Sequence, residues 1–281
     1  MCVLVQRVQT AGKSIAYFSS AGPVGFMNKK IVARDVAIIY RGRNEQKPVL
    51  ACNGVDLEVE EGAFISIVGP SGCGKTTLLY AIDGLLPINR GEIRVNDKPV
   101  SGPGTDRAMV FQSAALLPWR TVWGNITYGL KLHAGLDGTD GANVENLIDM
   151  VGLRGFERRY PSELSGGMQQ RANLARALAV DPEILLLDEP FASVDAQTRE
   201  KLQNDLTRIW QRTEKTMVFV THDIAEAVFL SDHVVVLSAR PARVRTVILI
   251  NLPRPRSPEI KLSPVLQDYV RQIWHLIDVP S

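Results

Sequence analysis

The sequence predicts an α/β fold in which helices cover both faces of a mostly parallel sheet. The first observation is that short apolar runs, typical of buried strands, alternate with longer stretches of helix-forming residues. The second is a glycine-rich turn at residues 69–77, which stands between one of these strands and the next helix. At 281 residues the chain is long enough for one large or two small domains with an ample core.

The N-terminal third is predicted to be rich in strands. Residues 31–40 and 49–59 carry alternating or β-branched apolar side chains, and residues 63–68 form a mostly apolar run. The glycine-rich turn follows that run, and we expect a helix over residues 78–86. Two further strands are predicted at residues 91–95 and 108–111.

The strand pattern fades from about residue 113 to residue 170, where helical segments with short breaks take its place. We interpret this region as a helical subdomain inserted into the α/β core. A helix over residues 168–180 is expected to stop at Asp181 and Pro182, because proline cannot continue a helix. The remaining core elements are strands at residues 184–187, 217–220 and 234–237 and helices at residues 197–212 and 224–230.

The two ends of the chain are predicted to lie outside a core of residues 31–252. Residues 1–30 are expected to be a disordered extension, with Met27 as an alternative start of the protein. Residues 253–281 are expected to hold a stiff linker, rich in proline, and then a helix. Ser263 and Pro264 suit the N-cap and first turn of that helix. We expect it to dock on the body, and binding of a partner or regulator stays open as an alternative.

The composition narrows the class of protein. The formal net charge of +2 gives no reason to expect binding to nucleic acid or to an anionic membrane surface. Cys2, Cys52 and Cys73 are scattered, which argues against a disulfide framework and fits a reducing cytosol. No apolar run approaches the ~18–20 residues that span a bilayer, so a role in transport would need a pore formed by another chain.

Residues 69–76 fit the pattern G-x-x-x-x-G-K-[ST] after a strand and before a helix, which is the context that this pattern requires. The glycines let backbone N–H groups turn inward and cradle phosphate oxygens. Lys75 is expected to reach the β- and γ-phosphates of a nucleotide, and the Thr76 hydroxyl to bind Mg²⁺. The predicted nucleotide-binding residues of this phosphate loop are Gly69, Pro70, Ser71, Gly72, Cys73, Gly74, Lys75, Thr76 and Thr77.

Cys73 lies inside the phosphate loop, next to a helix start that can favour the thiolate. We therefore expect a maleimide to modify Cys73 and bound nucleotide to protect it. This reactivity does not require Cys73 to take part in catalysis.

Asp188 and Glu189 stand at the end of a fully apolar strand. A carboxylate in this place is expected to hold Mg²⁺, usually through water, which assigns Asp188 to the metal. Glu189 is placed to orient and polarise the water that attacks the γ-phosphate. Without the phosphate loop, the same two residues would more simply begin a loop.

A second glycine site lies upstream, in the run Leu164-Ser165-Gly166-Gly167-Met168-Gln169-Gln170-Arg171. Ser165 stands at a helix start, where a hydroxyl and free N–H groups bind anions. With this run between the phosphate loop and the acidic pair, the chain resembles the nucleotide-binding subunit of an ATP-binding cassette (ABC) transporter from about residue 31 to residue 252. It departs from the family at Met168, where the consensus is Gln.

The resemblance implies a P-loop NTPase (RecA-like) core with an N-terminal antiparallel β-subdomain and an inserted α-helical subdomain. It also implies hydrolysis of ATP with Mg²⁺ as cofactor. Gln112 matches a glutamine that senses Mg²⁺ and the γ-phosphate, and so joins Thr76 and Asp188 as a candidate metal ligand. His222 matches the switch histidine that forms a hydrogen bond to the γ-phosphate. The implied catalytic residues are Lys75, Gln112, Glu189 and His222.

Further nucleotide contacts are implied by the same resemblance. Tyr40 matches the aromatic residue that stacks on adenine, with a half-buried strand tyrosine as the alternative. In the family two copies enclose ATP between the phosphate loop of one and the signature of the other, here Ser165, Gly166 and Gly167. Residues 193–195 match the D-loop, which lies at the interface between the copies.

Residues 102–107 and 116–126 look like the importer subfamily for nitrate, sulfonate, taurine and related solutes. This implies a peripheral subunit on the cytoplasmic face of the cell (inner) membrane that couples ATP hydrolysis to uptake of a small organic or inorganic anion. The implied partners are a second copy, integral membrane permease subunits and, indirectly, a solute-binding protein, and not nucleic acid. Trp119 is a candidate for the surface that receives the permease, with packing inside the helical insert as the alternative.

Two other functions stay open. A non-transport ABC ATPase of DNA repair or translation is the first, although repair members carry long coiled coils, translation factors carry two cassettes, and this chain has neither. An importer of another small solute, such as an aromatic acid or a vitamin precursor, is the second, because the ATPase does not touch the solute.

Overall fold

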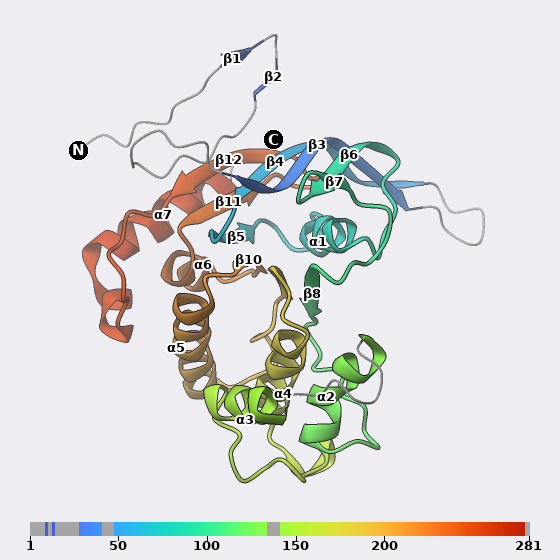
Figure 1. Cartoon of the computed structure of the whole chain (residues 1–281). Coiled ribbons are helices and arrows are strands. Elements are labelled where there is room, and N and C mark those ends of the chain that lie inside the picture. Colours follow the sequence, from blue (N-terminus) through green and yellow to red (C-terminus); the bar gives the residue numbers. More distant parts are fainter. Residues whose placement is uncertain (1–8, 11–12, 15–27, 41–47, 134–140, 279–281) are drawn as a thin grey trace.

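The computed structural model describes residues 9–10, 13–14, 28–40, 48–133 and 141–278. At its centre is a sheet with the strand order β12-β11-β5-β10-β9-β8 (Figure 1). The strands from β11 to β8 run parallel, while β12 pairs antiparallel with β11. The mostly parallel sheet predicted from the sequence is thus confirmed. Its strands are β5 Phe64–Val68, β8 Arg107–Val110, β9 Ile184–Asp188, β10 Thr216–Val220, β11 His233–Leu237 and β12 Val244–Leu249.

Both faces of the central sheet are buried because each strand sends alternate apolar side chains into two different clusters. In β10, Met217 and Phe219 pack into the cluster that includes helices α4, α5 and α6. Val218 and Val220 pack into the opposite cluster, which includes α1 (Lys75–Asp83) and the antiparallel sheet. A sheet covered on both sides requires strands with continuous apolar runs, as at residues 184–187 of β9 and 217–220 of β10.

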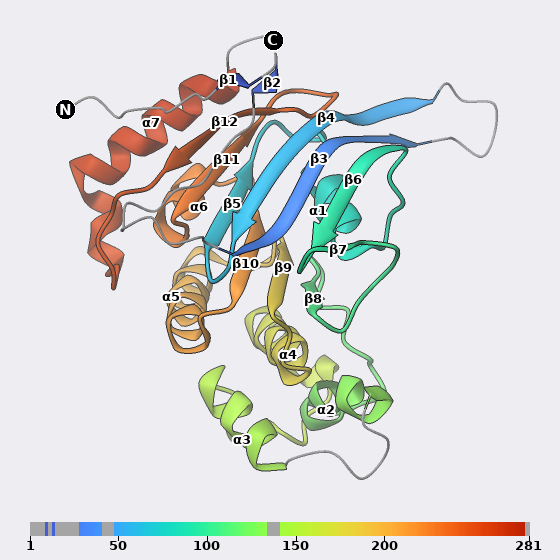
Figure 2. The same cartoon turned by 45° about the horizontal axis from the view of Figure 1, so that its top comes forward.

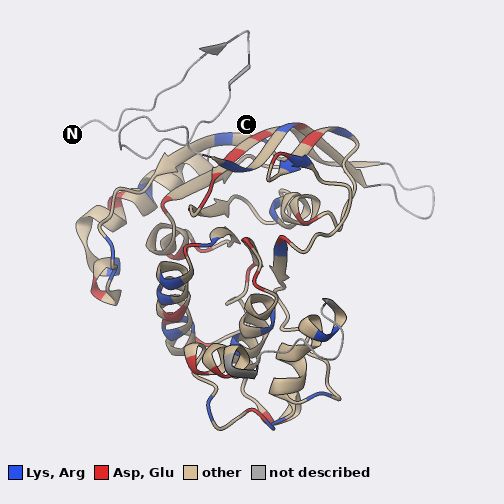
Figure 3. Ribbon diagram, viewed as in Figure 1, with Lys and Arg blue, Asp and Glu red and all other residues tan. Residues whose placement is uncertain are grey.

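The antiparallel sheet covers α1 and has the strand order β4-β3-β6-β7 (Figure 2). Its strands are β3 Lys29–Tyr40, β4 Val49–Glu60, β6 Arg90–Val95 and β7 Lys98–Pro99. The buried Glu58 on β4 pairs with Lys29 and Arg34 on β3, and basic and acidic residues are interspersed along the ribbon of this sheet (Figure 3). The antiparallel β-subdomain expected from the sequence is confirmed.

The helical insert lies beside the carboxyl end of β8 and contains α2 (Val122–His133), α3 (Gly141–Met150), the 3-10 helix η1 (Pro161–Glu163) and α4 (Gly166–Ala179) (Figure 1). Helix α4 begins where Ser165 caps it, since the Ser165 hydroxyl accepts from the Met168 backbone N–H at 3.3 Å. This start is two residues earlier than the predicted start at residue 168.

The chain then continues through α5 (Ala196–Thr213), α6 (Ile224–Leu230), the 3-10 helix η2 (Pro258–Leu262) and α7 (Pro264–Asp278). Asp195 and Asp223 cap α5 and α6 by accepting from backbone N–H groups. Helix α7 begins at the predicted Ser263–Pro264 pair, and it buries Leu266 and Ile273 completely. No helix among the described residues is both long and apolar enough to cross a bilayer.

Three expectations differ from the structure. Helix α1 ends at Asp83 rather than residue 86, because Gly84 adopts a left-handed φ of 87° and a Cβ there would lie 2.2 Å from the Gly102 carbonyl oxygen. Strand β12 was not expected at all. Strand β3 begins at Lys29, inside the segment expected to be a disordered extension. The rest of that expectation, for residues 1–27, lies outside the described residues, apart from a short pairing of β1 (Gln9–Thr10) with β2 (Lys13–Ser14).

Candidate nucleotide-binding site

The phosphate loop connects the carboxyl end of β5 to the first turn of α1. Lys75 is the first residue of α1, and its Nζ donates to the carbonyl oxygens of Gly69 at 2.9 Å and Pro70 at 3.1 Å. Gly74 has a φ of 124°, and a Cβ there would lie 3.0 Å from the Ala51 carbonyl oxygen. Only glycine accepts both conditions without strain. The loop therefore folds back around the Lys75 ammonium at the positive end of α1.

Thr76 and Asp188 meet below this loop. The Thr76 hydroxyl donates to Asp188 Oδ1 at 2.8 Å, although 112 residues separate them in sequence. Asp188 is 4% exposed, and burial raises the pKa of its carboxyl while hydrogen bonds from Thr76 and Tyr80 oppose the shift. A hydroxyl oxygen beside a carboxylate is the kind of donor set that Mg²⁺ binds, so these residues fit the metal assigned to them. Tyr80, one turn along α1, was missed by sequence reasoning.

Glu189 and His222 form a second pair at neighbouring strand ends. The distance between Glu189 Oε2 and His222 Nδ1 is 2.8 Å. Parallel pairing of β9 and β10 sets Asp188 opposite Val220, which brings the next residues of both strands to the same edge. Glu189 adopts a left-handed φ of 42°, and its N–H donates to the Val220 carbonyl oxygen at 2.9 Å. Left-handed backbone is unusual for glutamate and is common at functional sites.

A cavity of about 310 Å³ lies over the phosphate loop, a size in the range of small-molecule sites. The Tyr40 hydroxyl lies 3.1 Å from Thr77 Oγ1, and the Tyr40 side chain lines the cavity. Arg240 lies across the loop, where its Nε donates to the Gly72 carbonyl oxygen at 3.2 Å. Sequence reasoning missed Arg240, which has no signal except its place just after the last parallel strand. The lining residues are Tyr40, Val49, Ala51, Ser71, Gly72, Gly74, Lys75, Thr76, Thr77, Glu189 and Arg240.

Two groups of predicted site residues lie elsewhere. The Gln112 side chain is exposed and does not line the cavity, although its backbone oxygen accepts from Gln170 Nε2 at 2.7 Å. Ser165, Gly166 and Gly167 at the start of α4 do not line the cavity either. The structure thus unites the phosphate loop, Tyr40, both acidic residues and His222, and leaves the signature outside.

Cys73 differs from the reactive thiol expected from the sequence. Its side chain lies under the loop and the residue is 1% exposed. Burial is the largest influence on this thiol and raises its pKa, against the opposing effect of Lys75. The structure therefore supports neither the exposure nor the lowered pKa on which the expected maleimide labelling depends.

Trp119 is exposed, at 70% of its surface, so the alternative of packing inside the insert is wrong for this residue. The cause lies in Asn125, which is completely buried. Its Nδ2 donates to the backbone oxygens of Leu117, Arg120 and Thr121, and its Oδ1 accepts from the Leu117 N–H at 2.7 Å. This single amide holds the loop closed from the inside, so Trp119 at its tip points outward.

Comparisons with known proteins agree with this geometry. A family model described as "ABC transporter" matches residues 52–192. An uncharacterized ABC transporter ATP-binding protein of Methanocaldococcus jannaschii is 54% identical over 230 residues, which cover 82% of this chain and 85% of that protein. The aliphatic sulfonates import ATP-binding protein of Bacillus licheniformis is 47% identical, over 76% of this chain and 81% of that protein. The taurine import ATP-binding protein of Escherichia coli O157:H7 is 46% identical, with coverages of 74% and 81%.

Among solved structures, this chain is similar to a dimeric ATP-binding cassette in a post-hydrolysis state with ADP and Pi bound. The TM-score is 0.70 at 29% sequence identity, and the match covers 79% of this chain and all of the other. That similar protein is thus a dimer with ADP and Pi bound.

Proposed function

This chain belongs to the ABC transporter family as an ATP-binding and ATP-hydrolysing subunit, and from this premise we propose that its hydrolysis of ATP drives the import of a small anion. Sulfonates and taurine are the first solutes to test, since two relatives with 46–47% identity carry those names. Nitrate is a third, because it is also a small anion. The observation that carries the proposal is the contact of Thr76 with Asp188 directly beside the Glu189–His222 pair.

We assign binding of the ATP phosphates to the loop and its lysine. The Lys75 ammonium donates hydrogen bonds to the carbonyl oxygens of Gly69 and Pro70. When ATP binds, it would donate to the β- and γ-phosphates instead. Tyr40 lines the cavity and offers a ring for the base. Thr76 and Asp188 would hold Mg²⁺, which supplies charge neutralisation on the phosphates when bound.

Glu189 is assigned to the attacking water and His222 to the γ-phosphate. Glu189 accepts from His222 in the present geometry, so both groups face the same space at the edge of the sheet. An in-line attack needs a positioned water and a stabilised charge more than covalent chemistry. The Glu189 N–H donates to the Val220 carbonyl oxygen, and this bond fixes the backbone of Glu189. The Glu189 carboxylate would then lie beside the attacking water.

We propose that a second copy completes the site. Ser165 and Gly166 are exposed at the start of α4 and lie apart from the cavity, so each chain holds two separate half-sites. A helix start that offers a hydroxyl and free N–H groups fits the phosphate of an ATP held by the other copy. The dimeric similar structure supports this arrangement. Gln112 would join the site only when the domains close, because its side chain points to solvent here.

The exposed Trp119 loop is proposed to receive a permease subunit. An exposed tryptophan on a loop fixed from within is the kind of rigid anchor that interfaces use. The subunit would then lie on the cytoplasmic face of the cell membrane, and a solute-binding protein would deliver the anion to the permease. Binding of ATP by two copies would shift the permease between its states, because closed copies and open copies differ in affinity for ATP.

A direct test of the site is the substitution Lys75→Ala. Removal of the ammonium should weaken ATP binding by at least about tenfold, because a charged hydrogen-bond donor to the phosphates is lost. Titration of a fluorescent ATP analogue measures this, with Lys98→Ala on the exposed strand β7 as the matched control. Undiminished binding by Lys75→Ala would contradict the assignment of the loop.

For the solute, a deletion strain grown on a panel of sulfonates, taurine and nitrate should fail to grow on one class of these compounds.

A further inference from the structure

A network of hydrogen bonds links the C-terminal segment to the loop that carries His222. Lys261 in η2 donates from Nζ to Gln203 Oε1 on α5 at 2.5 Å. Gln203 in turn donates from Nε2 to Glu226 Oε1 on α6 at 2.8 Å. Thr221, directly before His222, donates from Oγ1 to Glu226 Oε2 at 2.5 Å. Four side chains from four different parts of the chain thus form a network that ends at Thr221, the residue before the proposed switch histidine.

The middle of this network is shielded from water. Gln203 is 4% exposed, Thr221 2% and Glu226 6%. Buried polar groups that lose their partners lower stability, so each of these bonds restrains the next. Both carboxylate oxygens of Glu226 are used, one by an amide and one by a hydroxyl. The Glu226 carboxylate is therefore held in one orientation.

Lys261 fixes the direction of the whole network. An ammonium group only donates hydrogen bonds, so the amide oxygen of Gln203 must face Lys261. The amide nitrogen of Gln203 then faces Glu226, which only accepts when it is ionised. A flipped amide would set its oxygen against the carboxylate and its nitrogen against the ammonium. Loss of Lys261 would remove the reason for the present orientation.

The Thr221 hydroxyl connects this network to the backbone on both sides of His222. It donates to Glu226 and accepts from the Asp223 backbone N–H at 3.0 Å. The Thr221 N–H donates to the Ile67 carbonyl oxygen on β5 at 3.3 Å. The backbone before and after His222 is therefore held, while its imidazole contacts Glu189.

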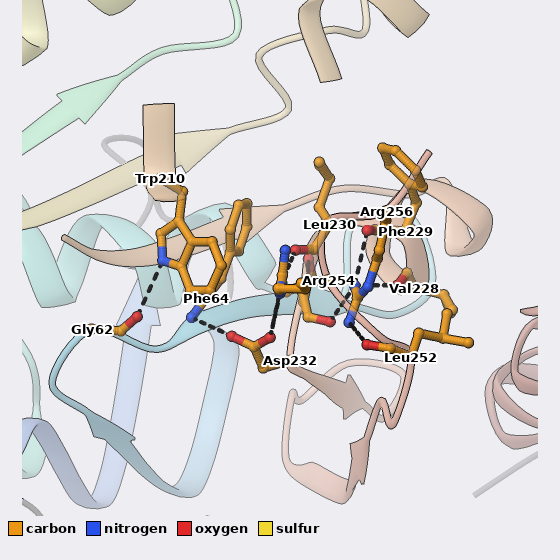
Figure 4. A network of polar contacts seen from close by, with 12 residues as sticks. Gly62, Phe64, Trp210, Val228, Phe229, Leu230, Asp232, Leu252, Arg254 and Arg256 are labelled. Carbon is orange, nitrogen blue, oxygen red and sulfur yellow. Dashed lines mark hydrogen bonds and ion pairs between the residues drawn. The ribbon is translucent and has the colours of Figure 1, made fainter. Parts of the chain in front are cut away.

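The same segment also holds the far end of α6 (Figure 4). Arg256 is 5% exposed, and its Nη1 donates to the backbone oxygens of Val228 and Phe229 at 3.0 and 2.9 Å. Arg254 donates to the Leu230 backbone oxygen at 2.6 Å and to Asp232 Oδ1 at 2.9 Å. These carbonyls form the negative end of α6, where cations are favourable. Helix α6 is thus fixed at its end by two arginines and near its start by Lys261 acting through Gln203.

We propose that residues 253–262 position His222 for ATP hydrolysis and that Lys261 is the residue through which they do so. This inference rests on the proposed role of His222. It assigns a role in catalysis to a segment that contains none of the phosphate-binding motifs. Lys261 is a positioning residue, since it touches neither nucleotide nor water and acts through Gln203, Glu226 and Thr221.

The test is the substitution Lys261→Met in the full chain, which keeps most of the apolar stem and removes the ammonium. We expect kcat for ATP hydrolysis to fall by at least about fivefold, as for loss of one hydrogen bond to a charged group, while the KM for ATP stays within about twofold. Lys261→Arg should restore most of the rate. Arg271→Met on the exposed part of α7 is the matched control and should leave kcat unchanged. Thermal unfolding of each variant checks that it folds.

Three additional variants separate the possible results. If Lys261 acts through Gln203, the double variant Lys261→Met/Gln203→Leu should be no slower than Gln203→Leu alone. A normal kcat for Lys261→Met, or a fall equal to that of Arg271→Met, would overturn the inference. His222→Ala in the same assay tests the premise: if that variant hydrolyses ATP normally, the proposed site itself fails. If only His222→Ala is inactive, the site stands and the positioning role of Lys261 falls.

Discussion

Glu189 and His222 face each other across the ends of β9 and β10, with 2.8 Å between Oε2 and Nδ1. Glu189 directly follows β9, and its backbone N–H donates to the carbonyl oxygen of Val220, the last residue of β10. Sheet pairing therefore fixes Glu189. His222 lies two residues beyond β10, where the Thr221 hydroxyl bonds to Glu226 and to the Asp223 N–H.

Glu189→Gln should bind ATP but nearly stop hydrolysing it. The amide keeps the size of the carboxylate and loses the charge that polarises water, so kcat should fall by at least about 10²-fold. The variant should then accumulate as a dimer when ATP is present. Size-exclusion chromatography with and without ATP measures this. Glu145→Gln, on the exposed side of α3, is the control. Hydrolysis at the normal rate by Glu189→Gln would remove this residue from the reaction.

Ser165→Arg should leave ATP binding by one chain intact and prevent the dimer from closing. Ser165 is exposed and does not line the cavity, so an arginine there adds bulk and charge at the proposed interface alone. The change also removes the cap on α4, which costs about 0.5–2 kcal/mol. Ser165→Ala loses the same cap without the bulk and separates the two effects. Dimer formation by Ser165→Arg at the normal ATP concentration would count against a role for the signature.

Cys73 should resist maleimide in the folded protein, with or without ATP. The residue is 1% exposed, and burial raises the pKa of its thiol, so little thiolate forms near pH 7 and reagent cannot reach it. Peptide mapping by mass spectrometry after a short exposure measures the labelling of this residue. The denatured chain should label fully, as the positive control. Rapid labelling of the folded chain, blocked by ATP, would show that the loop opens.

Trp119→Ala should leave the free subunit unaffected and weaken its binding to the permease. The side chain is 70% exposed, so thermal stability and the ATPase rate of the free subunit should not change. Copurification with a tagged permease from the native host measures the loss. Trp123→Ala is the contrast, because Trp123 packs partly against the core and its removal should lower the melting temperature. Full copurification of Trp119→Ala would place the permease elsewhere.

Much of this site could be predicted because its residues follow buried strands. Lys75 follows β5 after the phosphate loop, Asp188 ends β9, and His222 stands two residues after β10. Parallel strands bring these carboxyl ends to one edge. The contact of Thr76 with Asp188 needed only that arrangement. Strand order itself was not predictable, because β5 pairs with β10 and β11 rather than with strands near it in sequence.

The residues that were missed act through distant or backbone contacts. Arg240 reaches the phosphate loop by donating to a backbone oxygen of Gly72, which no pattern of side chains encodes. Asn125 is an isolated asparagine in a helix, and its three bonds to loop carbonyls appear only when the loop is folded. The burial of Cys73 was misjudged since a helix start predicts charge but not exposure.

Strand β12 has a consequence for how the chain behaves at high concentration. It is the edge strand of the central sheet, next to β11. The backbone N–H and C=O groups of an edge strand can pair with a strand of another molecule. Arg243 and Arg245 flank its start, and Arg245 reaches the Leu276 backbone oxygen of α7. These two arginines interrupt the apolar run, which is why the strand was not predicted. Their charges also oppose edge-to-edge pairing between copies. Replacement of both arginines by valine should therefore promote edge-to-edge association between copies.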